Sequence, residues 1–265
     1  GVAATGAGAT VTITIAGGGG GGVFDTAATP TYPDNPTVQG VWYGDGTKAL
    51  TFDTECVVLG NGARGTDTGA TSVGFSSRAT GTRGAAYGRS CWATGFESSA
   101  FGSYTTASGI QSTAVGGSVN ATANYASAFG YNAAASAAES LAAGSSAVAN
   151  AAGASALGSN TTASGIESAA VGSYATASGL RSCAVGLAVA SANYCCAMGF
   201  NSSATGSSAT ALGAEAITSG VNSVAVGRAN VVGDNSVGVG YCSTVAQSVA
   251  VGSGSAASVV QGVAL

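Results

Sequence analysis

The sequence contains no histidine and one lysine, and charged and aromatic residues each make up only 7% of its 265 residues. Without histidine, neither a Ser-His-Asp nor a Cys-His nucleophile can be assembled, and Lys48 alone leaves little for Schiff-base chemistry. With so few aromatic residues, a thick core of large interdigitating side chains cannot form. We therefore expect a thin interior and a protein that is not an enzyme.

Long hydrophobic runs and basic clusters are also missing. Glycine interrupts the alanine-rich stretches every few residues, so no run reaches the ~18 apolar residues that suggest a transmembrane helix. The seven basic residues are spread from Lys48 to Arg228, and the formal net charge is −4. We accordingly expect no membrane insertion, and no nucleic-acid binding, which would need a basic stripe facing the phosphates.

The six cysteines include no CxxC pair, and without histidine a zinc site would need thiolates or carboxylates alone. We assign no metal and no other cofactor. Their irregular spacing also differs from the disulfide frameworks of small secreted proteins, so we expect mostly reduced thiols. The cysteines are Cys56, Cys91, Cys183, Cys195, Cys196 and Cys242.

A glycine, here called the repeat glycine, recurs every 14 residues at the end of the pattern S/A-x-A-φ-G, in which φ is apolar. After Gly186 the steps are 13, 14, 14, 13, 12 and 10 residues, so the repeat shortens toward the C-terminus. A fixed internal period is typical of solenoids. The repeat glycines are Gly60, Gly74, Gly88, Gly102, Gly116, Gly130, Gly144, Gly158, Gly172, Gly186, Gly199, Gly213, Gly227, Gly240, Gly252 and Gly262.

Columns of similar residues accompany the repeat glycines. The residue before each glycine is apolar, and we predict that this column forms the core. Alanine dominates two positions before the glycine and five positions after it, and we expect something to approach these small side chains closely. A second glycine often follows at half the period, as at Gly109 and Gly165. The predicted core column is Leu59, Val73, Tyr87, Phe101, Val115, Phe129, Ala143, Leu157, Val171, Val185, Met198, Leu212, Val226, Val239 and Val251.

Two glycine-marked halves per period predict two short strands and two tight turns per coil, hence a flattened parallel β-roll. A helix is rejected because each glycine would cost it about 1 kcal/mol, and because Ser, Thr and Val alternate with Ala at a period of two. About fifteen coils at a strand separation of roughly 4.8 Å predict a rod on the order of 70 Å long. The fold class is therefore all-β, with the solenoid over residues 56–265.

Charged residues keep the same register. Five of them lie five residues before a repeat glycine, which predicts a solvent-facing corner. Arg83 and Glu97 are one coil apart and opposite in sign, so we expect a stacked ion pair. The same holds for Glu167 and Arg181. An acid pair of Glu139 and Glu167 is conceivable, but about 10 Å separates their backbones, and no catalytic residue is assigned.

Residues 1–55 lie outside the repeat. Residues 10–15 alternate Thr with Val and Ile, which predicts a strand, and residues 17–22 are consecutive glycines, which predict a flexible hinge. All the prolines follow within residues 30–36, and then the aromatic pair Trp42 and Tyr43. We interpret this part as a small attachment or capping segment that feeds the solenoid.

The segments STAVG (112–116), SAAVG (168–172) and SVAVG (223–227), joined by linkers such as TASG (162–165), resemble the head repeats of YadA-like trimeric adhesins. The resemblance spans residues 56 to about 262. It implies a left-handed parallel β-roll in which three chains pack side by side as a homotrimer whose surfaces bind host or matrix ligands. A flank lined with Ala and Ser that packs against a copy of itself fits this expectation, because a thin roll buries little on its own.

The sequence departs from bacterial adhesins, since no heptad stalk and no membrane-anchor strands follow the repeats, and six cysteines are many for the family. We expect no complete autotransporter. Head repeats of this kind also occur in viral and phage fibres, and a short aromatic segment before a rod suits attachment to a particle. We therefore favour a viral or phage fibre or spike at the virion surface, docked through residues 1–55, with an unspecified host-surface or glycan ligand. The alternative is the head fragment of a secreted adhesin at a bacterial surface.

An ice-binding solenoid is a further alternative, because some solenoids present flat Thr ladders to ice. The column four residues after the repeat glycine argues against it, since the residue types do not repeat regularly. That column reads Arg78, Trp92, Thr106, Asn120, Ala134, Val148, Thr162 and Thr176.

Two cysteines share one phase of the repeat. Cys183 and Cys196 each lie three residues before a repeat glycine, so they should stack about 4.8 Å apart on neighbouring strands. Neighbouring parallel strands aim both side chains the same way, which opposes disulfide geometry. We predict free, stacked thiols here, with Cys195 on the opposite face of its strand.

Overall fold

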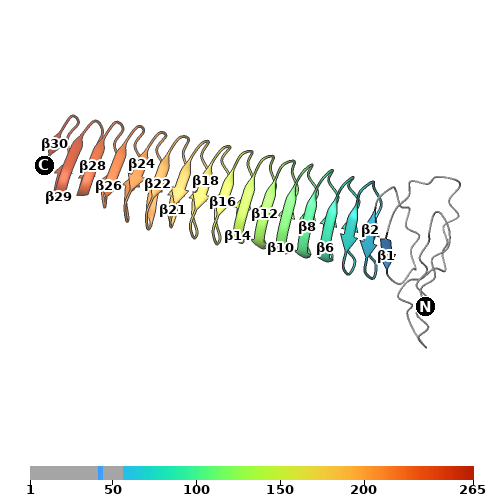
Figure 1. Ribbon diagram of the computed structural model, residues 1–265. Coiled ribbons are helices and arrows are strands. Elements are labelled where there is room, and N and C mark those ends of the chain that lie inside the picture. The colour runs from blue at the N-terminus through green and yellow to red at the C-terminus, as the bar shows by residue number, and fades with distance from the viewer. Residues whose placement is uncertain (1–40, 44–55) are drawn as a thin grey trace, which may run out of the picture.

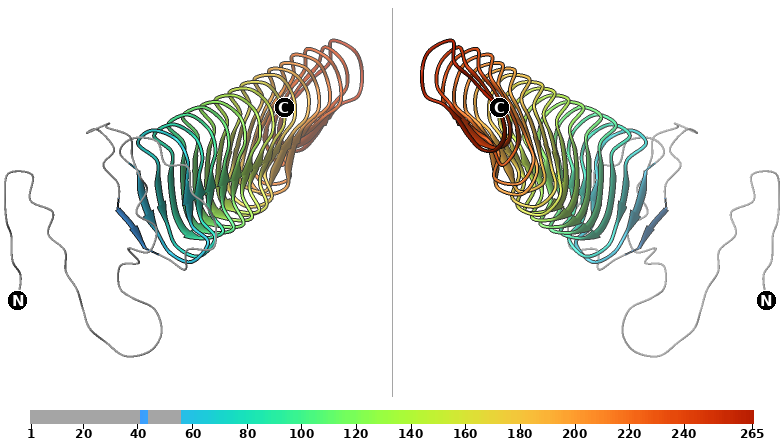
Figure 2. Two further views of the ribbon diagram at one scale, coloured as in Figure 1. Left: turned by 90° about the vertical axis from the view of Figure 1, so that its right-hand side faces the viewer. Right: turned by 90° about the vertical axis from the view of Figure 1, so that its left-hand side faces the viewer.

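The computed structural model describes residues 41–43 and 56–265, which form one rod of stacked parallel strands (Figure 1). The first coils lie at one end of the rod and the last strand at the other, as the colour gradient shows. Seen from the ends, each coil is a flattened loop with a strand along each long side (Figure 2). The described residues contain no helix, in agreement with the predicted all-β solenoid of about 14 residues per coil.

The two long sides of the coils carry different strands, and we call them side A and side B. Side A is formed by β1 (Val41–Tyr43), β2 (Val57–Leu59), β4 (Thr71–Val73), β6 (Ala85–Arg89), β8 (Ser99–Ser103), β10 (Thr113–Gly117), β12 (Ser127–Tyr131), β14 (Leu141–Ser145), β16 (Ser155–Leu157), β18 (Ala169–Val171), β20 (Cys183–Val185), β22 (Cys196–Met198), β24 (Thr210–Leu212), β26 (Val224–Gly227), β30 (Val263–Ala264) and the first parts of β28 (Val237–Thr244) and β29 (Val249–Ala257).

Side B is formed by shorter strands and by the second parts of β28 and β29, which turn the corner without a break. The separate strands of side B are β3 (Arg64–Gly65), β5 (Arg78–Ala79), β7 (Trp92–Ala93), β9 (Thr106–Ala107), β11 (Asn120–Ala121), β13 (Ala134–Ala135), β15 (Val148–Ala149), β17 (Thr162–Ala163), β19 (Thr176–Ala177), β21 (Ala188–Ala190), β23 (Ser202–Ala204), β25 (Ile217–Thr218) and β27 (Asn230–Val231).

The register follows the sequence period. On side A, β10 pairs with β12 so that Ala114 lies beside Ala128 and Gly116 beside Gly130. Where the period shortens to 13, the pairing follows it, and β20 meets β22 with Cys183 beside Cys196. Identical phases of the repeat therefore form straight columns along the rod.

Each coil turns at two corners, and the residue at the turn has a left-handed backbone. Glu97 and Glu167 occupy one corner with φ of 53° and 55°, and Tyr104 and Tyr174 occupy the other with φ of 57°. We expected glycine to supply these conformations, but mostly polar or aromatic residues hold them, with their side chains pointing outward from the corner. The corner predicted from the charges is confirmed.

The repeat glycine is needed both for its backbone angle and for space. Gly116 has φ of 133°, which disfavours L side chains, and a Cβ built on it would overlap the carbonyl oxygen of Gly130 in the next coil. Gly109, at half the period, lacks a positive φ, but its Cβ would overlap the carbonyl oxygen of Ala123. At these points the coils stack backbone on backbone.

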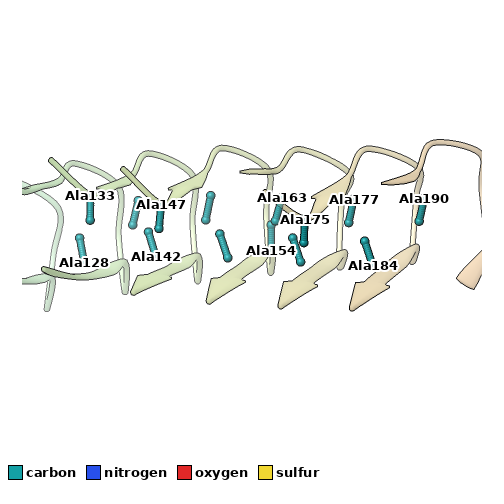
Figure 3. Packing of buried hydrophobic residues seen from close by; sticks show 14 of the residues in the cluster. Ala128, Ala133, Ala142, Ala147, Ala154, Ala163, Ala175, Ala177, Ala184 and Ala190 are labelled. Carbon is teal, nitrogen blue, oxygen red and sulfur yellow. The ribbon is translucent and has the colours of Figure 1, made fainter. Parts of the chain in front are cut away.

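The interior is a double layer of alanine, and our predicted core column is wrong. Ala128 and Ala142 from side A point toward Ala133 and Ala147 from the facing layer, and all four are fully buried (Figure 3). The apolar residue before each repeat glycine points the other way, because side chains alternate along a strand. The coil is too flat to enclose anything much larger than Ala, Ser, Cys or Thr.

The ladder of side A begins before the predicted start of the repeat, because β1 pairs in parallel with β2. That strand falls inside the segment predicted to cap or attach the solenoid. The predicted strand at 10–15 and the glycine hinge at 17–22 lie outside the described residues.

Candidate interaction surfaces

The residues before the repeat glycines form a continuous apolar stripe along the outside of side A, and we call this column, Leu59 to Val251 as predicted above, the apolar stripe. Its members are half-buried or exposed, for example Tyr87 at 37%, Phe129 at 40% and Met198 at 41%. Tyr87 and Phe101 stack face to face with centroids 4.9 Å apart. The side chains thus cover one another along the rod but remain open to solvent on top.

An exposed apolar surface of this length is unusual on a protein that stays alone. Soluble monomers rarely expose large contiguous apolar patches, and those that occur are often interaction sites. The outer neighbours on side A, two residues earlier in each strand, are mostly small, such as Ser127, Ser155 and Ala169. A flat partner can therefore approach the stripe closely along the rod.

Side B presents a different surface. Its outward residues include the column weighed for ice binding, and the structure places that column along one face, with Arg78 paired to Trp92 and Trp92 to Thr106. Its first members are bulky and charged, so the column is not a uniform Thr ladder. Two residues further along each coil runs a hydroxyl column, exposed or half-buried, that consists of Thr66, Thr80, Thr94, Ser108, Thr122, Ser136, Asn150, Ser164, Ser178, Ser191, Thr205 and Ser219.

Both predicted ion pairs are confirmed at the corner that joins side B to side A. The guanidinium of Arg83 lies 2.6 Å from the Glu97 carboxylate, and that of Arg181 lies 2.6 Å from Glu167. Hydrogen bonds from Gln111 and then Arg83 lower the pKa of Glu97, and the hydrogen bond from Arg181 lowers the pKa of Glu167.

The analysis of the sequence missed a third ion pair, between Arg228 and Glu215. These residues occupy different phases of the repeat, at the corner that joins side A to side B. They meet because the coil that begins at Gly227 is one residue shorter than its predecessor and has no left-handed residue at that corner. The shortening toward the C-terminus, noticed as spacing alone, was the signal that could have revealed it.

The conceivable acid pair does not converge. Glu139 and Glu167 sit at equivalent corners two coils apart with Gly153 between them, and Glu167 is bound by Arg181. No cluster of three or more potential metal ligands occurs in the part of the chain that the structure describes. That same part includes no helix with the length and hydropathy that crossing a bilayer requires.

Four of the six cysteines are interior residues that stand in for serine. Cys195 donates to the carbonyl of Ala192 over 2.9 Å, as Ser112 at the same phase donates to Gly109 over 2.8 Å. Cys91 donates to the carbonyl of Gly102 over 3.0 Å. Cys56 and Cys242 are also buried at these corner phases. Their positions are explained by packing and local hydrogen bonding.

The remaining two cysteines face outward from side A. Cys183 and Cys196 lie in register on β20 and β22, half-buried and not disulfide-bonded, whereas Cys195 lies inside, which confirms the predicted arrangement. Desolvation, followed by the influence of Cys183, raises the pKa of Cys196 to about 11. At neutral pH this thiol stays protonated and is a poor nucleophile.

These features define a class: a repetitive parallel β-solenoid with an alanine interior, an apolar outer stripe and polar corners. The sequence profile of the YadA head domain repeat matches at residues 93–118, 121–145, 163–187, 197–216 and 204–230. The chain therefore carries YadA head domain repeats, and the resemblance drawn from the 14-residue pattern is confirmed. A comparison with curated proteins finds no match.

Proposed function

We propose that the protein is a structural, adhesive fibre component in which three copies pack along their apolar stripes into one rod. The observation that carries this proposal is the stripe itself, which runs the length of the solenoid on one side only. YadA head domains typically form trimers. The correction to the core strengthens the argument, since the large apolar side chains are available to a partner and are not used inside the coil.

Burial explains why a single chain needs partners. Inside each coil the buried apolar side chains are mainly alanines, and apolar burial stabilises by roughly 25 cal/mol per Å². The larger Val, Leu, Phe and Met side chains of the stripe contribute fully only when a second surface covers them. Cyclic packing of three identical stripes covers all of them at once and leaves side B facing solvent.

The native mass of the full chain tests this proposal. Sedimentation equilibrium or native mass spectrometry is expected to show three chains per particle across a wide range of protein concentrations. A stable, folded monomer would contradict both the packing and the adhesive rod built on it.

We further propose that the rod belongs to a viral or phage particle, with residues 1–55 as the attachment segment and the virion surface as its location. Six cysteines without a disulfide are compatible with assembly in a reducing cytoplasm. Alkylation of denatured protein before any reductant is added is expected to give six free thiols. A bonded Cys183–Cys196 pair would instead favour the head of a secreted bacterial adhesin.

The proposed role is structural and not catalytic. The chain lacks histidine, and the two glutamates that could form an acid pair stand apart at exposed corners. Turnover of a glycan substrate that is lost in both Glu139→Gln and Glu167→Gln would contradict this part of the proposal.

A further inference from the structure

We infer that the first coils of the rod bind an acidic polysaccharide through Arg64, Arg78 and Arg89 together with the ring of Trp92. These residues lie where side A turns into side B, near the end of the rod closest to residues 1–55. The inference rests on the proposed attachment role and names the class of ligand for it.

Two guanidinium groups stack on each other in this place. Arg64 on β3 pairs in register with Arg78 on β5, and Arg78 pairs with Trp92 on β7. Neighbouring strands lie about 4.8 Å apart, and like charges directly opposite one another destabilise a sheet. The solenoid therefore carries a repulsion that a bound anion would relieve.

Elsewhere the rod neutralises its arginines. Arg83, Arg181 and Arg228 each lie against a glutamate of a neighbouring coil. In contrast, no carboxylate of residues 56–265 lies within ion-pair distance of Arg64, Arg78 or Arg89. The unpaired arginines are confined to the first coils, so they form a local anion-attracting surface and not a scattered set.

The distribution of charge along the rod adds to this local effect. Residues 56–102 contain four arginines and two acidic residues, whereas residues 103–265 contain two arginines and four acidic residues. An anionic chain is therefore attracted to the N-terminal coils and repelled by the rest of the rod. Three copies in one trimer would present this surface three times, which raises the apparent affinity for a repetitive polymer.

Exposed aromatic rings hold two of these guanidinium groups in place. The Arg78 guanidinium lies 5.4 Å from the centre of the Trp92 ring, and that of Arg89 lies 4.6 Å from the Tyr104 ring. Trp92 is 43% exposed, so one flat apolar surface remains open beside the charges. A guanidinium next to an open ring suits a sugar that carries an anionic group, because the ring packs against the C–H face of the sugar while the guanidinium binds the anion.

Hydroxyl groups continue the surface across side B. Thr66, Thr80 and Thr94 follow the column of Arg64, Arg78 and Trp92 two residues further along each coil, on the same outward face. They offer donors and acceptors to sugar hydroxyls at the spacing of the coils. An extended polysaccharide that runs along the rod axis would meet charge, ring and hydroxyl groups in successive coils. Duplex nucleic acid has no use for this open ring, because its bases are stacked away from it.

The test is binding of the full chain to immobilised heparin and to hyaluronan, which separate sulfate from carboxylate ligands, in about 0.15 M NaCl. The double variant Arg64→Gln/Arg78→Gln is expected to weaken binding about tenfold or more and to reduce the salt slope by about two, roughly one per arginine. It should fold at least as well as the wild type, because it removes a like-charge pair. The matched control is Arg181→Gln/Arg228→Gln, which changes the net charge equally and should bind within about twofold of wild type.

Trp92 provides a second readout that charge alone would not move. Trp92→Ala should weaken binding at unchanged salt slope, and Trp92→Phe should restore most of it. Equal loss in both double variants, binding to duplex DNA as tight as to heparin, or no binding to either polysaccharide would overturn the inference. Native mass measured on the same samples separates the outcomes: a trimer that ignores the polysaccharides leaves the rod proposal intact, whereas a monomer contradicts that proposal itself.

Discussion

The two long sides of the solenoid enclose the same alanine interior but face outward in different ways. Side A carries Val, Leu, Phe and Met before each repeat glycine, whereas side B carries mostly hydroxyl and small residues at its two outward positions. The inner columns barely vary, because the coil closes on a space that fits only small side chains. The outer columns vary freely in size, so the differences between the sides reflect what each side contacts and not what holds the coil together.

The comparison begins with what both sides share, which is the close stacking of the coils. Gly116→Val should abolish folding into soluble protein, because the new side chain would overlap the Gly130 backbone and force an unfavourable φ. The neighbouring Gly117→Val is the matched control, since its Cβ would meet only the ring of Tyr131 at 3.2 Å. Yield and circular dichroism of the two proteins measure the effect. Equal losses would show that the period has been assigned the wrong phase.

Charging each side separately tests which of them associates. Val171→Asp places a carboxylate in the apolar stripe, and burying it against two copies should dissociate the trimer, at a cost of several kcal/mol per unpaired buried charge. Thr162→Asp places the same group on side B, where it remains in water and should leave the mass unchanged. If Thr162→Asp were the variant that dissociates, the associating side would be side B.

Enlarging adjacent alanines distinguishes the inside of a strand from its outside. Ala142 is fully buried, so Ala142→Leu should destabilise the protein by about 1–3 kcal/mol through overpacking. Ala143 follows it in β14 but belongs to the apolar stripe, where Leu157 and Leu212 already occur. Ala143→Leu should therefore be tolerated, and denaturant unfolding compares the two. A more damaging Ala143→Leu would reverse the assignment of inner and outer faces.

The exposed corners should contribute least. The ion pair with Arg181 lowers the pKa of Glu167, so its stabilisation is present above the ordinary glutamate pKa and is lost as the pH falls through the lowered value in the fold. Glu167→Gln should thus lower thermal stability slightly at neutral pH and make no difference in strong acid. Glu139→Gln, at an equivalent corner without an ion pair among the described residues, is the control. A large effect of either variant would mean that the corners take part in a contact between chains.

The sequence alone determined the period, the strand-and-turn coil, the exposed corners with their ion pairs, and the register that stacks Cys183 on Cys196. All of these follow from spacing, because stacking one coil on the next brings equal phases together. The ion pair of Arg228 and Glu215 escaped this reasoning because a shortened coil moved two different phases into contact.

Only the tertiary structure decided which side of each strand is the inside. Alternation divides a strand into two faces, but Ala170 and Val171 are both apolar, and hydrophobicity by itself favoured the larger as core. The width of the closed coil settles the choice, because two strands and two tight turns in 14 residues leave room only for alanine-sized side chains. That width also turned the apolar column outward and placed Arg64 on Arg78. The surfaces proposed to bind other chains and ligands thus follow from how narrowly the coil closes.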